Sequence, residues 1–165
     1  MADDFPIPIP GQSLGVSFAK TTRQQRQAIV SLLFMAYATQ YPLVETKKAT
    51  QAGSYLSVAP QSLPAVLASE LGVSLEQAHE LFGQGPAAVF GLLRSLPLAG
   101  RILALLLALF IVAPDSPEEI SPITSKLLMI WGLETQVMPD ELMPDLVRYG
   151  EQVSRFLSGK EFSSN

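Results

Sequence analysis

The stretch RILALLLALFIVAPDSPEEI, residues 101–120, decides the fold, because it contains twelve apolar residues in a row from Ile102 to Ala113. A helix that crosses a bilayer needs about 20 apolar residues, whereas a run of about 10–14 is more typical of a helix buried in a protein core. Arg101 precedes the run, and Pro114 follows it. We therefore predict a central helix over 98–113 that is enclosed by the protein's own helices, and no membrane span.

The composition narrows the classes of function. A chain of 165 residues fits one domain, which can bury roughly 70% of its unfolded surface without disulfides or metals. The absence of cysteine excludes thiol nucleophiles, disulfides and thiolate zinc sites. The net charge of −4 makes binding to a phosphate backbone unfavourable. The N-terminus lacks the basic start and apolar run of a secretory signal, so we expect a cytoplasmic protein.

Apolar residues at three- and four-residue steps predict further helices around the central one. We expect them over 22–39, 46–58, 64–71, 74–82, 86–96, 121–132 and 139–157. Thr22 with Gln25, and Ser74 with Gln77, have the spacing of capping boxes. The sequence contains no alternating run of β-branched residues bounded by turns, so we predict no strand. The predicted fold class is all-α, a single-domain helical bundle of seven or eight helices.

The chain is expected to divide into three parts. Residues 1–20 form an extended arm, because Pro6, Pro8 and Pro10 disfavour the helical conformation of the residues before them. We expect Phe5 and Ile7 of this arm to pack on the bundle, together with Ile9. Residues 21–157 form the all-α domain, and residues 158–165 form a flexible tail.

The sequence also contains an internal echo. A shift of 75 residues places Arg26 on Arg101 and Leu32 on Leu107 without a gap. The same shift aligns Ala38 with Ala113, Pro42 with Pro117 and Thr46 with Ser121. The echo indicates a pseudo-twofold repeat of two helical hairpins, although a Leu-rich helical chain can produce such a match by chance.

Two segments, AIVSLLFMAYATQYPLVETKKA at 28–49 and RILALLLALFIVAPDSPEEISPITSKLLMIWGL at 101–133, resemble the TerB-like family, which is named for tellurite resistance. The resemblance covers residues 22–157 and implies a pseudo-symmetric all-helical fold with an intracellular interaction or stress-response role. Loops of that family usually carry an Asp-Gly pair and a Glu, whose carboxylates are thought to gather and bind metal. Here the loops offer Thr39-Gln40 and Asp115-Ser116. Only Asp115 matches, so a metal site is not carried over.

The one acidic loop cluster consists of Asp115, Glu118 and Glu119. Calcium takes about six to eight oxygen ligands, so three carboxylates are too few unless another segment contributes. Negative charge near a helix N-terminus is itself favourable by about 0.3–1 kcal/mol for each group. We therefore expect this cluster to stabilise a helix start and not to bind a metal.

No catalytic constellation is visible in the sequence. His79 is the sole histidine, and Glu76 or Glu80 could orient it, but no serine lies in a nucleophile elbow. Arg94 and Arg101 could clamp an anionic ligand, although pairing with loop carboxylates is the simpler expectation. We predict no catalytic, cofactor-binding or metal-binding residue, and hence no enzyme.

Late in the chain, Trp131 and three methionines, Met129, Met138 and Met143, admit two interpretations. Methionine makes adaptable binding surfaces, but it also fills gaps in cores. For all four residues we expect the core.

The segment LASELGVSLEQAHELFG at 67–83 has the order of a helix-turn-helix, which makes a DNA-binding protein the alternative function. Its second helix carries Glu76 and Glu80 and no Lys or Arg, so it would repel phosphates. The function predicted first is therefore a non-enzymatic, TerB-like interaction module. Its expected partner is a protein or a second copy of itself, and nucleic acid is not expected.

Overall fold

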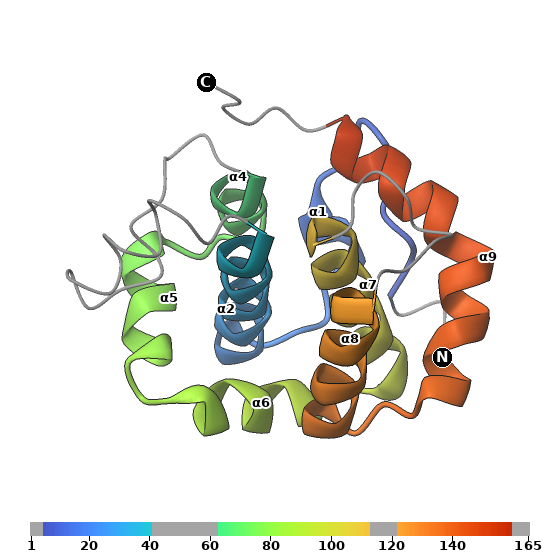
Figure 1. Ribbon diagram of the computed structural model, residues 1–165. Coiled ribbons are helices and arrows are strands. Elements are labelled where there is room, and N and C mark those ends of the chain that lie inside the picture. The colour runs from blue at the N-terminus through green and yellow to red at the C-terminus, as the bar shows by residue number, and fades with distance from the viewer. Residues whose placement is uncertain (1–4, 41–62, 113–121, 160–165) are drawn as a thin grey trace.

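Eight helices occupy the residues that the structure describes, which are 5–40, 63–112 and 122–159 of the chain. In this computed structural model (Figure 1) no strand lies among those residues. The helices are α1 (Leu14–Ser17), α2 (Arg23–Gln40), α4 (Leu63–Glu70), α5 (Leu75–Phe82), α6 (Pro86–Arg94), α7 (Leu98–Val112), α8 (Pro122–Thr135) and α9 (Pro139–Ser158). The fold is an all-α, single-domain bundle, as predicted. The helix expected over 46–58 lies outside the described residues, as does the tail from residue 160 onward.

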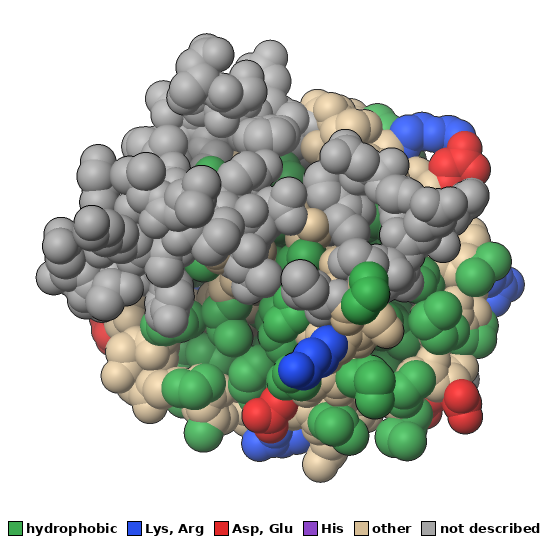
Figure 2. All heavy atoms as spheres, in the orientation of Figure 1, with side chains coloured by type: hydrophobic (Ala, Val, Ile, Leu, Met, Phe, Trp, Pro, Cys, Tyr) green, Lys and Arg blue, Asp and Glu red, His purple; other side chains and the backbone are tan. Residues whose placement is uncertain are grey.

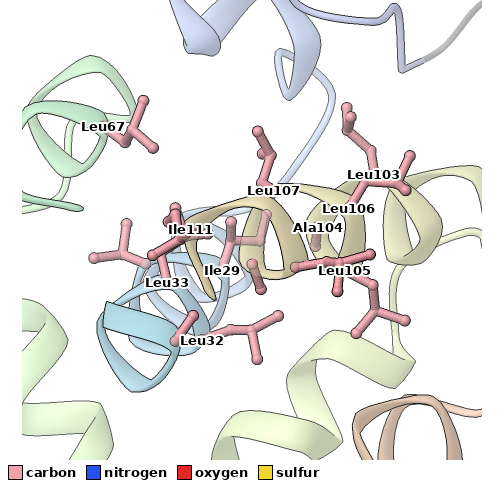
Figure 3. Packing of buried hydrophobic residues seen from close by; sticks show 14 of the residues in the cluster. Ile29, Leu32, Leu33, Leu67, Leu103, Ala104, Leu105, Leu106, Leu107 and Ile111 are labelled. Atoms are coloured by element: carbon pink, nitrogen blue, oxygen red, sulfur yellow. The ribbon is translucent and has the colours of Figure 1, made fainter. Parts of the chain in front are cut away.

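The α7 helix lies at the centre of the bundle. Every residue from Leu103 to Val112 is buried, and none is more than 8% exposed. Its side chains project in all directions and meet Ile29, Leu32 and Leu33 of α2 (Figure 3). The helices α8 and α9 pack against it from other directions. The predicted burial of the central helix is confirmed over these residues. No helix within the described ranges has both the length and the apolar character that a bilayer crossing requires.

Seven of the eight described helices, all except the short α1, form two groups and the helix α6 that joins them. On one side α2 packs against α4 and α5, and on the other α7 packs against α8 and α9. Figure 1 shows α6 running along the lower edge of the molecule between the two groups. Contacts of α6 with α2, α5 and α8 tie the groups together, and the longest shared interface is that between α2 and α7.

Two helices begin with the capping boxes expected from the sequence. At the start of α2 the amide of Thr22 donates to Oε1 of Gln25 at 2.9 Å, and the amide of Gln25 donates to Oγ1 of Thr22 at 3.1 Å. At the start of α5 the reciprocal distances between Ser74 and Gln77 are 3.0 and 3.1 Å. Each box satisfies two amides that the first turn of a helix leaves without partners.

Residues 1–20 were predicted to form an extended arm, but the arm is not extended throughout. It contains the short helix α1, because the prolines stop at Pro10 and Ser13 then caps the amide of Gly15 at 3.1 Å. The amide of Leu14 also donates to a carboxylate oxygen of Glu70 at 2.5 Å. Phe5 is buried against the bundle as expected, whereas Ile9 is exposed.

The internal echo has a structural counterpart, since α2 and α7 begin 75 residues apart. Before each helix the chain makes the same turn, in which one amide donates to the carbonyl three residues earlier. The side chain of an arginine in the first turn of the helix then donates to a backbone carbonyl. That carbonyl belongs to the residue whose amide makes the first bond. The residues are Phe18, Thr21 and Arg26, at 3.2 and 3.0 Å, and Leu93, Leu96 and Arg101, at 3.1 and 3.0 Å. The equivalence extends to the buried Leu14 of α1 and Val89 of α6.

Candidate functional site

The helix α8 has two apolar sides with opposite environments. Its inner side is a stripe at three- and four-residue steps, formed by Thr124, Leu128, Trp131 and Thr135, all of them buried. The hydroxyl of Thr135 donates to the carbonyl oxygen of Trp131 at 2.7 Å, so this buried polar group is satisfied. The prediction that Trp131 belongs to the core is confirmed.

The outer side of α8 leaves large apolar side chains in solvent. Met129 is 57% exposed, Ile130 is 44% exposed and Leu133 is 71% exposed. Lys126, one turn before them, and Glu134, just after them, are exposed as well. We call these five residues the α8 face. Figure 2 shows hydrophobic side chains gathered on this side of the molecule, over α8 and toward α9, with single charged side chains among them.

The three methionines late in the chain are not core residues. Met129, Met138 and Met143 are all exposed, which contradicts the prediction that they fill the core. Because α8 is apolar on both sides, its apolar pattern alone does not say which side faces inward. On α9 the buried stripe passes through Leu142 and Leu146, so that Met143 points away from it. The sequence signal that could have revealed the outer face of α8 is the pair of charges that flank it.

The end of α8 is closed by a Schellman motif. The amide of Val137 donates to the carbonyl of Gly132 at 2.8 Å, and that of Gln136 donates to the carbonyl of Leu133 at 3.3 Å. Gln136 adopts a φ of 60°, the left-handed conformation for which glycine is usual at this position. A Cβ atom on Gly132 would lie 2.8 Å from the carbonyl oxygen of Val137, so the motif also requires a glycine there.

Arg94 and Arg101 hold this helix end in place. Nη1 of Arg94 donates to the carbonyl of Glu134 at 2.6 Å, and Nη1 of Arg101 donates to those of Thr135 and Gln136 at 3.0 and 2.9 Å. Cations are favourable at the carbonyl end of a helix. The expected anion clamp or pairing with loop carboxylates is therefore replaced by binding to backbone carbonyls. This contact fixes α8 on the α6–α7 corner and so sets where the α8 face points.

The α4–α5 hairpin contains the residues of the alternative, DNA-binding interpretation. Gly72 joins the two helices with a φ of 71°, as a tight turn requires. Glu76, His79 and Glu80 lie exposed on α5, which has no Lys or Arg. The surface that would enter a DNA groove is therefore acidic.

No candidate metal site is found in the described part of the chain. Over residues 5–40, 63–112 and 122–159, no group of three or more His, Asp or Glu side chains is placed where it could hold a metal ion. The cluster of Asp115, Glu118 and Glu119 lies outside those ranges.

No family model, no curated protein and no solved structure matches the chain. The resemblance to TerB-like proteins therefore stays a prediction.

Proposed function

We propose that the protein is a non-enzymatic interaction module, and that it associates with a second copy of itself through the α8 face. The observation that supports this is the row of three large apolar side chains, Met129, Ile130 and Leu133, left in solvent along one helix. Single exposed apolar side chains are ordinary, but neighbouring ones rimmed by charges are typical of interaction sites.

A second copy is the partner that the charges favour. Lys126 and Glu134 bracket the apolar row, with Ile130 midway between them in sequence. In a symmetric dimer, a contact of residue i with residue j is matched by a contact of j with i. Two α8 helices packed antiparallel about a two-fold axis at Ile130 would set Lys126 of each chain against Glu134 of the other. Such surface pairs add little affinity, but they fix the register and orientation of the apolar contact.

The proposal carries over an intracellular, stress-associated role from the resemblance to TerB-like proteins. The DNA-binding alternative gains nothing from the arrangement of α5, because the exposed carboxylates of Glu76 and Glu80 would repel phosphates.

Sedimentation equilibrium of the full chain tests the association. We expect a dimer whose Kd rises at least about 100-fold in Leu133→Asp, since each dimer loses two buried leucines that contribute roughly 1.5–3 kcal/mol each. Val147→Asp is the matched control, because Val147 lies on α9 and is 82% exposed. A wild-type chain that stays monomeric at every concentration, or a Leu133→Asp variant that dimerises like wild type, would contradict the proposal.

A charge exchange tests the orientation separately. Lys126→Glu and Glu134→Lys should each weaken the dimer, because each sets like charges against one another across the axis. The double variant should recover the wild-type Kd. If the double variant is no better than either single variant, the antiparallel arrangement is wrong.

A further inference from the structure

A pocket of about 330 Å³ opens between the N-terminal arm, the first half of α7 and the middle of α9. Its apolar wall is formed by Phe5 and Ile7 from the arm and by Leu98, Ile102 and Leu106 from α7. Leu106 belongs to the fully buried part of α7, so the pocket extends inward as far as the central helix. A volume near the lower end of the usual range for ligand pockets suits one small molecule.

The polar end of the pocket comes from one turn of α9. Asp145, Arg148 and Tyr149 all line it. The guanidinium carbon of Arg148 lies 5.2 Å from the centre of the Tyr149 ring, which is a cation–π contact. Asp145 is half-buried, while Arg148 is exposed.

The two charges at this end make no ion pair or hydrogen bond within the described residues, and Arg148 contacts only the Tyr149 ring. Residues three apart on a helix are neighbours, yet Asp145 and Arg148 form no ion pair with each other. Neither has another hydrogen-bond or ion-pair partner among the described residues. A carboxylate and a guanidinium thus stand side by side at the edge of an apolar pocket.

We propose that this pocket binds a free α-amino acid with a large apolar side chain. The ammonium group pairs with Asp145, the carboxylate pairs with Arg148, and the side chain enters between Phe5 and Ile102. A ligand with only one charge is a poorer complement, because an aliphatic acid would face the carboxylate of Asp145 and an aliphatic amine would face the guanidinium of Arg148. The pocket shares no residue with the α8 face, so failure of either proposal leaves the other standing.

Calorimetric titration of the full chain with three related probes tests the assignment. The probes are L-phenylalanine, phenethylamine, which lacks the carboxylate, and 3-phenylpropionate, which lacks the ammonium. We expect phenylalanine to bind about tenfold or more tightly than either analogue, since each analogue loses one charge-assisted hydrogen-bonding group. Equal affinity for one of the analogues, or no heat with phenylalanine at millimolar concentration, would overturn the proposal.

Two substitutions locate the binding. Asp145→Asn and Arg148→Gln should each weaken phenylalanine binding about tenfold or more. The matched controls are Asp140→Asn, on the same helix, and Arg23→Gln, on α2, both exposed and outside the pocket; they should bind like wild type. Unchanged binding in both pocket variants would refute the assignment.

A measurement on the wild-type chain does not depend on how the variants fold. Methyl resonances of Ile7 and Ile102 should shift on titration with phenylalanine, because both side chains line the pocket. Shifts confined to residues elsewhere would place the binding outside it and reject the proposal.

Discussion

The contact between Phe5 and Gly100 predicts a substitution whose effect on stability changes sign with its background. A Cβ atom on Gly100 would lie 2.8 Å from Cε1 and 2.9 Å from Cζ of Phe5, and the three nearest neighbours of that atom all belong to this ring. The ring is 5% exposed and packs edge-on against Phe18, with the ring centres 6.0 Å apart. Gly100→Ala must therefore shift the Phe5 ring from its position.

The magnitude follows from two opposing terms. A shift of the Phe5 ring loses at most the burial of one aromatic side chain, about 1.5–3 kcal/mol, and weakens its ring contact with Phe18. Alanine in place of glycine within α7 gains about 1 kcal/mol of helix propensity. In the wild-type background Gly100→Ala should thus lower the free energy of unfolding by about 1–2 kcal/mol. In a Phe5→Ala background only the propensity gain remains, and the same change should stabilise by about 1 kcal/mol.

Urea unfolding of the four proteins of this double-mutant cycle, followed by circular dichroism, measures both effects. We expect a coupling free energy of about 2–3 kcal/mol between the two positions. Additive effects of the two substitutions, or a stabilising effect of Gly100→Ala in the wild-type background, would show that the arm does not pack on α7 as described.

The end of α8 supports two further predictions. Gln136→Gly should raise the free energy of unfolding by about 1 kcal/mol, because glycine adopts the left-handed conformation without a Cβ penalty; thermal melts should show a Tm higher by about 2–4 °C, and an unchanged or lower Tm would argue against the Schellman motif. Arg101→Met keeps the apolar stem but removes the donors to three carbonyls, and urea unfolding should show a loss of about 2 kcal/mol. A loss no larger than that of the exposed control Arg23→Gln would mean that these bonds do not anchor α8.

Most helices could be predicted because their signals are local. The boxes at Thr22 and Ser74 depend on residues three positions apart, and an apolar run as long as that of α7 leaves only the choice between core and bilayer. The correspondence between Arg26 and Arg101 is local as well, since each side chain donates to the backbone carbonyl five residues earlier.

The features that the sequence did not reveal depend on long-range partners. Arg94 and Arg101 bind carbonyls, which every residue possesses, so no side-chain pattern could identify them. Met129, on the outer side of α8, was predicted to lie in the core because the apolar pattern alone does not distinguish it from the buried Leu128 beside it. The pocket was missed because its lining comes from three segments far apart in the chain.

The central position of α7 has a consequence for synthesis of the chain. Of the helices that enclose it, α2 precedes it, while α8 and α9 are translated afterwards. In a nascent chain that has emerged only as far as α7, the sides of this apolar helix that α8 and α9 later cover are still exposed, and transiently exposed apolar surface of this kind promotes aggregation. Protection during translation, by the ribosome surface or by a chaperone, matters most in the interval before α9 leaves the exit tunnel.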